Sequence, residues 1–253
     1  METTNDLVLG GRLRMTQPKR GYRIAIDPIL LAAAVPAAAG ERVLDAGCGV
    51  GTAGLALARR VDAITITGLE LQAVLADLAR CNAEDNGLAD SCSVITGDIL
   101  DPPPGLGDPP FDHVMANPPF MKVGEATPSP DPVAATATVE GDATLLDWAA
   151  FAARMIKRGG CVTMIHRADR AAELAGALVG AGFGDLAIFP LWPDAASKDG
   201  DLARAARRVI VQGRLGAEGP SRRLDGLVLH DADGGFLAEA EAVLRHAAAL
   251  PVA

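Results

Sequence analysis

The sequence has few aromatic side chains, few cysteines and no long apolar run. Phe, Trp and Tyr make up 4% of the 253 residues, and the four cysteines, Cys48, Cys81, Cys92 and Cys161, lack the paired spacing of zinc or redox-dithiol motifs. The longest apolar stretch, residues 29–39, contains a proline and is shorter than the ~18 residues that a membrane-spanning helix needs. We therefore expect reduced, mostly buried thiols and no membrane span.

The sequence also lacks a secretory signal and a histidine cluster. Its start, METTNDLVLG, has no basic region ahead of an apolar stretch, which favours a cytoplasmic protein. The four histidines, His113, His166, His230 and His246, do not have the spacing of metal ligands. We predict no metal site and expect these histidines to be structural or exposed.

Basic residues are outnumbered but locally concentrated. The formal net charge of -9 argues against a nucleic-acid partner. However, residues 12–23 hold five basic side chains and no acidic one, and residues 198–223 hold seven basic against three acidic ones. The two segments are candidates for a phosphate-binding face, and ordinary solvated charge is the alternative.

From residue 40 onward, short apolar runs alternate with amphipathic stretches. The predicted strands cover 42–46, 63–70, 92–98, 111–117, 160–166, 184–191 and 207–214, and the predicted helices cover 52–60, 71–85, 142–157 and 168–180. This alternation predicts an α/β fold with a doubly wound, mostly parallel sheet of the Rossmann-like kind. Only a polar segment around Lys198 joins the last two strands, which predicts a hairpin and one antiparallel strand.

Smaller features flank this core. Residues 7–14 alternate around Gly10-Gly11, which predicts a hairpin, and Asp27-Pro28 is predicted to cap and start a short helix that ends at Val35. Residues 236–248 form a final amphipathic helix in this interpretation. We divide the chain into an N-terminal hairpin and helix (1–39), a core (40–218) and a C-terminal extension whose last helix packs on the core (219–253).

Residues 121–139 contain three prolines, many small side chains and no aromatic residue. A featureless segment of this length inside a compact domain is typical of a functional loop. We expect it to be weakly ordered alone and to become ordered with the acceptor.

Glycines follow the first core strand, in the segment VLDAGCGVG at 43–51. They allow the backbone to approach a ligand at the carboxyl end of a parallel sheet. Gly49, Gly51 and Gly54 also fit the pattern G-x-G-x-x-G, with Glu70 near the expected ribose position. A nicotinamide enzyme is therefore the alternative.

Two acidic residues favour a different cofactor. Asp45 precedes the glycines, where it would repel a pyrophosphate but attract the ammonium group of a methionine moiety. Asp98 follows the third strand, where it can accept a hydrogen bond from an adenine amino group while Ile99 packs on the ring. Together with Glu70 at the second strand end, these positions predict S-adenosyl-L-methionine as the cofactor.

The tetrapeptide Asn117-Pro118-Pro119-Phe120 follows the fourth strand. Its prolines have no amide hydrogen and restrict the preceding backbone, so they fix the turn and leave its carbonyl oxygens as acceptors. An exocyclic amino nitrogen can donate its two hydrogens to Asn117 and to the carbonyl of Pro118, which turns its lone pair toward the methyl group. Phe120 would stack on the planar acceptor. We predict that these four residues form the catalytic site.

With these motifs the chain resembles the class I methyltransferases, and more closely the bacterial tRNA(Val) adenine 6-amino methyltransferase family over nearly its whole length. The carrying segments are GGRLRMTQPKRGYRIAIDPILLAA, VLDAGCGVG, ANPPF and LVLHDADGGFLAEAEAVL. The resemblance implies that Asp27 closes over the methionine end of the cofactor. The expected cofactor positions are then Asp27, Asp45, Gly47, Gly49, Gly51, Glu70, Leu71, Asp98, Ile99 and Asn117.

The resemblance implies adenine in tRNA as the methyl acceptor. Guanine in rRNA and a protein glutamine are alternatives, because each presents a planar amino group to the same tetrapeptide. The family often carries basic residues after this motif, whereas residues 123–139 contain none, so the segments 12–23 and 198–223 would have to bind the phosphates. An NAD-dependent oxidoreductase, or a cofactor-binding module without catalysis, is the alternative of another class; Asp45 and the catalytic turn disfavour it.

Overall fold

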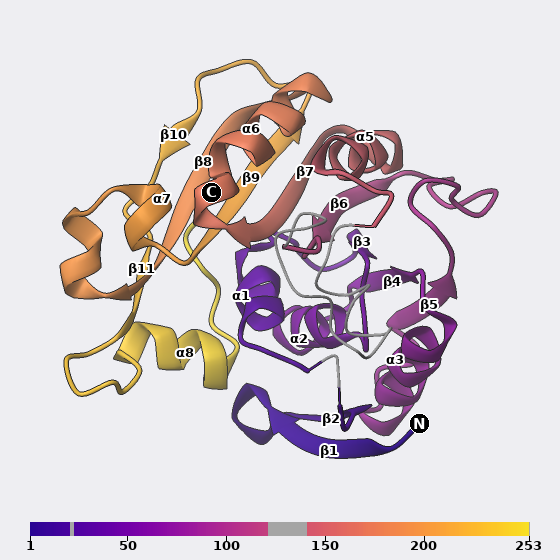
Figure 1. The fold of residues 1–253 in the computed structure, drawn as a ribbon. Coiled ribbons are helices and arrows are strands. Elements are labelled where there is room, and N and C mark those ends of the chain that lie inside the picture. Colours follow the sequence, from indigo (N-terminus) through magenta and orange to yellow (C-terminus); the bar gives the residue numbers. More distant parts are fainter. Residues whose placement is uncertain (21–22, 121–140, 253) are drawn as a thin grey trace.

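The computed structural model describes residues 1–20, 23–120 and 141–252 (Figure 1). The predicted loop at 121–139 lies outside these residues. Helices cover both faces of a central sheet, which in the described part of the chain has nine strands. They are β3 (Arg42–Ala46), β4 (Thr65–Glu70), β5 (Cys92–Thr96), β6 (Phe111–Ala116), β7 (Ile156–Arg167), β8 (Phe183–Asp194), β9 (Arg208–Leu215), β10 (Arg222–Arg223) and β11 (Leu227–His230).

The strand order confirms the predicted doubly wound sheet. The neighbours run β10-β8-β9-β7-β6-β3-β4-β5, and β11 also pairs with β8. β3 is parallel to β4 on one side and to β6 on the other, so the order of connection reverses beside β3. Ligands of such sheets bind at this reversal, outside the carboxyl ends of the strands. The segments after β3 and after β6 both lie there.

The predicted antiparallel strand is β9, which pairs antiparallel with both β7 and β8. Only the short 3-10 helix Ala195–Asp199 and the single-turn α7 (Leu202–Ala205) lie between β8 and β9. This segment makes a return connection, so the amino end of β9 lies at the carboxyl edge of its parallel neighbours.

Two groups of helices pack on the sheet. One apolar cluster includes side chains of α1 (Asp27–Ala34), α2 (Thr52–Arg60), α3 (Ala73–Asp85) and α8 (Ala238–His246). The other includes side chains of α5 (Leu145–Met155) and α6 (Ala171–Gly180). Alternate residues of β3 divide between them: Val43 joins the first cluster and Leu44 the second. This is the pattern of a strand buried on both faces.

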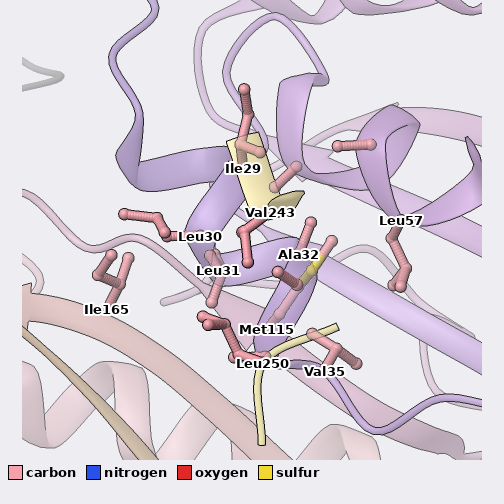
Figure 2. Close-up of a cluster of buried hydrophobic side chains, with 14 of the residues drawn as sticks. Ile29, Leu30, Leu31, Ala32, Val35, Leu57, Met115, Ile165, Val243 and Leu250 are labelled. Carbon is pink, nitrogen blue, oxygen red and sulfur yellow. The ribbon is translucent and has the colours of Figure 1, made fainter. Parts of the chain in front are cut away.

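Helix α1 lies inside the first cluster (Figure 2). Leu30 and Leu31 are fully buried and lie among Met115 and Ile165 of the sheet and Val243 of α8. Burial of each such leucine stabilises the fold by roughly 1.5–3 kcal/mol. The N-terminal helix is thereby fixed to the core and to the C-terminal helix.

The start of α1 differs from the prediction. Ile26, not Asp27, is the N-cap residue, and it makes no side-chain cap; Asp27 is the first helical residue. The Asp27 carboxylate instead binds Arg208 of the distant strand β9. A tertiary ion pair has replaced the local capping bond that a short polar residue before proline usually indicates.

The N-terminal hairpin is confirmed and is longer than predicted. Strands β1 (Thr3–Val8) and β2 (Leu13–Pro18) pair antiparallel around the turn Leu9–Gly11. In the C-terminal extension, β10 and β11 were missed by the sequence analysis. Both pair with the edge of β8 that does not pair with β9. Such short strands depend on the partner strand for their hydrogen bonds.

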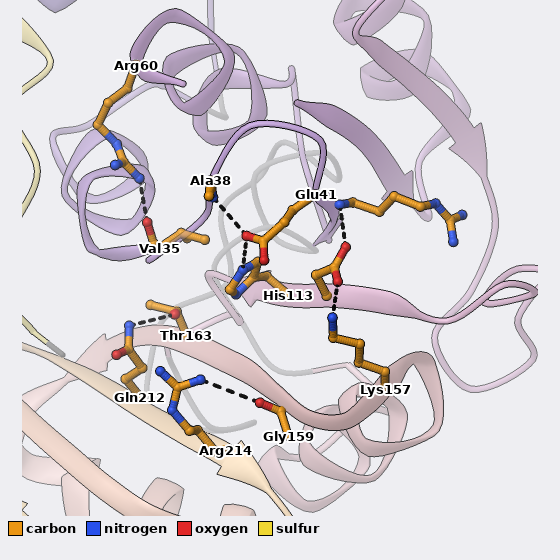
Figure 3. A network of polar contacts seen from close by, with 12 residues as sticks. Val35, Ala38, Glu41, Arg60, His113, Lys157, Gly159, Thr163, Gln212 and Arg214 are labelled. Atoms are coloured by element: carbon orange, nitrogen blue, oxygen red, sulfur yellow. Dashed lines mark hydrogen bonds and ion pairs between the residues drawn. The ribbon is translucent and has the colours of Figure 1, made fainter. Parts of the chain in front are cut away.

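Polar contacts tie the amino ends of the strands together, away from the ligand edge (Figure 3). Glu41 Oε2 accepts from the Ala38 amide and lies 2.9 Å from His113 Nε2. Within the sheet, Gln212 Nε2 donates to Thr163 Oγ1 at 3.1 Å and to the Ala34 carbonyl at 2.9 Å. His113 is therefore structural, as expected.

The cysteines behave as predicted from their spacing. Cys48, Cys92 and Cys161 are buried, Cys81 is exposed, and all four are free thiols. The described residues contain no cluster of three or more potential metal ligands. None of the helices in the described ranges has the length and apolarity needed to cross a bilayer.

Candidate functional site

The loop after β3 brings backbone amides and glycine surfaces to the sheet edge. Gly47, Gly49 and Gly51 have φ values of +67°, +57° and +86°, which favour glycine. A Cβ atom on Gly47 would lie 2.8 Å from Cη2 of Trp148, so glycine is also required there for space. The Gly47 amide donates to the Leu69 carbonyl at 2.8 Å, which holds the loop against the end of β4.

Glu70 connects this loop to the next strand end. Its Oε2 accepts from the Gly49 amide and its Oε1 from the Gln72 amide, both at 2.9 Å. The side chain is buried, and burial raises the pKa of the carboxyl group while the backbone amides partly offset that shift. Each oxygen keeps further acceptor capacity for a ligand hydroxyl.

A pocket, which we call the acidic pocket, opens beside these residues; its empty volume is about 980 Å³ and includes its open mouth. Three lining residues are acidic, Glu70, Asp98 and Asp142, and the described lining residues include no Lys, Arg or His. The described residues that line it are Gly47, Gly49, Leu69, Glu70, Leu71, Gln72, Leu75, Gly97, Asp98, Ile99, Leu100, Asn117, Pro119, Gly141, Asp142, Ala143 and Trp148.

Most of the predicted cofactor positions therefore meet in one pocket. Gly47, Gly49, Glu70, Leu71, Asp98, Ile99 and Asn117 all line it. Ile99 is 7% exposed and offers an apolar surface, and the neighbouring Asp98 carboxylate is half-buried. An adenine ring packed on Ile99 would present its amino group to Asp98.

The pocket also contains two buried polar atoms that have no partner in the described part of the chain. They are Oδ1 of Asn117, an acceptor, and Nε1 of Trp148, a donor. Buried polar atoms are almost always hydrogen-bonded, so an unpartnered pair in one pocket indicates a polar ligand. The residues fit S-adenosylmethionine, which carries positive charge at its sulfonium and ammonium groups and both donors and acceptors elsewhere.

Trp148 was missed by the sequence analysis. It lies in the first turn of α5, which begins with a capping box between Thr144 and Asp147. The Thr144–Asp147 pattern marks a helix start in the sequence. Nothing local, however, shows that this helix start lies against Gly47.

Three predicted cofactor positions do not line the pocket. Asp45 is buried beneath the loop, where its Oδ2 accepts from the Gly54 amide at 3.0 Å. Burial raises its pKa to about 7, and the nearby Glu70 adds to the shift. Gly51 is the N-cap of α2 and faces Ala79. Asp27 pairs with Arg208, at 2.9 Å between Oδ2 and Nε.

The catalytic turn predicted from the sequence lies between two hollows. Asn117 and Pro119 line the acidic pocket, whereas Phe120 lines a second hollow. Pro118 is buried and lines neither. The guanidinium carbon of Arg208 lies 4.3 Å from the centroid of the Phe120 ring and covers one face. That face is therefore not available for stacking on a planar acceptor.

His166, at the end of β7, supports this turn. Its Nε2 lies 3.3 Å from the Pro119 carbonyl oxygen, and its ring meets the Phe120 ring edge-on at 5.2 Å between centroids. Burial lowers its pKa to about 4, with a contribution from Arg170. At neutral pH the ring is uncharged, and Nε2 must carry the hydrogen because a carbonyl can only accept.

Known proteins are similar to this chain in sequence and structure. Residues 24–134 match the family model described as Methyltransferase small domain. Relatives from two strains of Porphyromonas gingivalis are both called tRNA1(Val) (adenine(37)-N6)-methyltransferase. One is 32% identical over 158 residues, covering 60% of this chain and 61% of the relative; the other is 30% identical over 179 residues, covering 67% and 68%.

A solved structure shares the fold over most of the chain. It is a predicted O-methyltransferase, protein Atu636, from Agrobacterium tumefaciens, with a TM-score of 0.68 and 25% identity. The match covers 88% of this chain and 98% of that one. For the first P. gingivalis relative the chain spans less than two thirds of the relative's length. Fold, pocket and sequence agree: the chain belongs to the methyltransferase family that includes the tRNA1(Val) (adenine(37)-N6)-methyltransferases, and it has the class I, S-adenosylmethionine-dependent fold.

Proposed function

We propose that this protein transfers a methyl group from S-adenosylmethionine to the 6-amino nitrogen of an adenine in tRNA. The observation that carries the chemistry is Oδ1 of Asn117, which lines the acidic pocket and is buried without a partner among the described residues. The names of the two P. gingivalis relatives support the choice of tRNA adenine. A tRNA substrate also supports the predicted cytoplasmic location.

The cofactor, when bound, supplies an electrophilic methyl group on a positively charged sulfur. Glu70, Asp98 and Asp142 favour a cation in the pocket and would repel the pyrophosphate of a nicotinamide cofactor. The Trp148 N–H is available to a cofactor oxygen. These residues therefore support the methyltransferase and oppose the oxidoreductase alternative.

On the acceptor side, Asn117 Oδ1 accepts one amino hydrogen. The carbonyl of Pro118, a residue that lines neither hollow, remains the acceptor predicted from the sequence for the second. Together they turn the nitrogen lone pair out of the ring plane and toward the methyl group. When the amino nitrogen takes the methyl group, it would release one hydrogen to solvent as a proton. Alignment, not a strong base, is the main contribution of the protein to this reaction.

The test is to incubate the protein with methyl-labelled cofactor and, separately, with total tRNA, rRNA and a release-factor protein, and then to identify the product. We expect N6-methyladenosine in tRNA. Asn117→Ala should lower turnover by roughly two orders of magnitude, as loss of a positioning contact does. The exposed Asn5→Ala on the N-terminal hairpin is the matched control. Methylguanosine in rRNA or methylglutamine in protein would refute the tRNA-adenine assignment.

A further inference from the structure

The second hollow, which Phe120 lines and which we call the arginine hollow, differs in charge from the acidic pocket. Its empty volume is about 850 Å³, including open solvent, and three of the seven lining residues that lie in the described ranges are arginines. The single acid among them is Asp169. The lining is Phe120, Arg167, Asp169, Ala203, Ala206, Arg207 and Arg208. In a chain with net charge -9, this is a local concentration of positive charge beside the catalytic turn.

The three arginines are not equally neutralised. Arg208 is held by Asp27, and Arg167 forms an ion pair with Asp169. Arg207 is exposed, and its guanidinium group has no ion-pair or hydrogen-bond partner among residues 1–20, 23–120 and 141–252. An Arg side chain has five donors in a planar fork that matches phosphate oxygens. Arg207 is therefore available to an anion that enters the hollow.

The two hollows adjoin at the catalytic turn. Pro119 lines the acidic pocket, and the next residue, Phe120, lines the arginine hollow. A cationic cofactor suits the first and an anionic group the second. A nucleotide whose base reaches Asn117 would carry its ribose and phosphate near the boundary between the two hollows.

The structure places part of the predicted basic segment elsewhere. The backbone amide of Arg14 donates to Oδ1 of Asn86, and its carbonyl accepts from Nδ2 of Asn86, the residue that caps the far end of α3. The near end of α3 supplies Leu75 to the cofactor pocket, and 13 helical residues span about 20 Å. Two other members are paired locally, Lys19 with Glu2 and Arg23 with Asp6. Among the described residues of this segment, 12–20 and 23, none lines the hollow next to the turn.

We propose that the hollow around Arg207 is a phosphodiester-binding subsite that holds the RNA backbone next to the acceptor base. This inference rests on the proposed function and names the part of the protein that selects a polynucleotide over a peptide. Phosphate contacts fix the register of the strand without reading its sequence. Arg207 binds the phosphate oxygens, and Arg208, which is held by Asp27, keeps Phe120 in place at the boundary.

The test compares Arg207→Gln with Arg14→Gln, an exposed arginine far from the turn. A second pair is Ala203→Glu, which places a carboxylate in the hollow from an exposed position, and Ala89→Glu, an exposed control after α3. Affinity for fluorescent tRNA is measured with protein saturated with S-adenosylhomocysteine, over a range of salt concentrations. Affinity for S-adenosylhomocysteine itself reports the folding of each variant.

We expect Arg207→Gln to weaken tRNA binding and to reduce the slope of log affinity against log salt by about 0.7–0.9, the effect of one lost phosphate contact. Ala203→Glu should weaken binding further, and both should leave S-adenosylhomocysteine binding and turnover at saturating tRNA within about threefold of wild type. Both controls should behave as wild type.

Two outcomes overturn the proposal and differ from each other. If wild-type protein methylates tRNA but Arg207→Gln and Ala203→Glu match their controls in affinity and salt slope, the subsite is refuted and the proposed function stands. If wild-type protein methylates a peptide and not RNA, the proposed function and the subsite fall together. If either Arg207→Gln or Ala203→Glu loses cofactor binding through misfolding, the other variant alone decides whether the subsite is refuted.

Discussion

His166 Nε2 donates to the carbonyl oxygen of Pro119 across 3.3 Å, and so the end of β7 fixes the turn that follows β6. The same ring meets Phe120 edge-on. Two neighbouring parallel strands thus cooperate at the predicted catalytic turn, one supplying the turn and the other supporting its backbone.

Loss of this support should affect turnover and not cofactor binding. We expect His166→Ala to lower methyl transfer to tRNA roughly fivefold to tenfold, the size of one hydrogen bond. His166→Gln, which keeps a side-chain N–H, should retain more activity. Affinity for S-adenosylhomocysteine, measured by calorimetry, should be unchanged in both. Equal activity of the Ala and Gln variants would show that the hydrogen bond has no positioning role.

Asp45 should make stability depend on pH. Its pKa is about 7 in the folded protein, against 3.8 as the ordinary value, so the folded state holds a proton that the unfolded chain has lost. Its contribution to the free energy of unfolding is therefore full below pH 4 and falls as pH rises to 7. Between pH 5 and 7 this loss is about 2 kcal/mol, because the slope is ~1.4 kcal/mol per pH unit at pH 5 and half of that at the folded pKa.

Asp45→Asn keeps an acceptor for the Gly54 amide but cannot ionise. We expect urea denaturation to show that the Asp45→Asn variant gains stability relative to wild type as pH rises from 5 to 7. The exposed Asp62→Asn is the control and should show no such gain. His166 acts with opposite sign, since its lowered pKa favours the folded state as pH rises from 4 to 6.5. A difference in stability between the Asp45→Asn variant and wild type that does not change with pH would contradict the prediction.

Trp148 should report cofactor binding directly. Its indole lines the acidic pocket with an unpartnered N–H, whereas the other tryptophan, Trp192, is 1% exposed and donates to the Asp225 carbonyl. We expect S-adenosylhomocysteine to change the fluorescence of wild type and of Trp192→Phe but not of Trp148→Phe. Trp148→Phe should also weaken binding about fivefold through the lost hydrogen bond. An unchanged signal from Trp192→Phe would place the ligand elsewhere.

Asp27 offers a test between two roles. The family resemblance implies a contact with the methionine end of the cofactor, whereas the structure pairs Asp27 with Arg208, which covers a face of Phe120. We expect Asp27→Asn and Arg208→Lys each to lower methyl transfer about twofold to tenfold, because both disturb the cation–π contact. Cofactor affinity should stay as in wild type. A large loss of cofactor affinity in Asp27→Asn alone would support the role implied by the resemblance.

Local patterns in the sequence were enough to predict the sheet and to select seven residues that line the acidic pocket. Strand and helix periodicity gave β3 and α2 with their observed bounds, because buried parallel strands and amphipathic helices repeat with different periods. The glycines at 47 and 49, Glu70 and Asp98 each follow a strand, and the carboxyl ends of parallel strands meet at one edge. The wrong assignment of Asp27 as a cap came from the same local reasoning, which does not include a partner 181 residues away.

By itself, then, the sequence determined the alternation of strands and helices, the glycine loop and the turn at Asn117, since each depends on residues close together in the chain. Tertiary structure alone decided that Asp45 faces Gly54 and not the pocket, that Trp148 lies against Gly47, and that Arg207 and Arg208 border Phe120. These contacts depend on helix packing and on strand order, and the antiparallel β9 brings its first residues to the ligand edge. No pattern of neighbouring residues encodes such contacts, because their free energy comes from surfaces that meet only after the chain has folded.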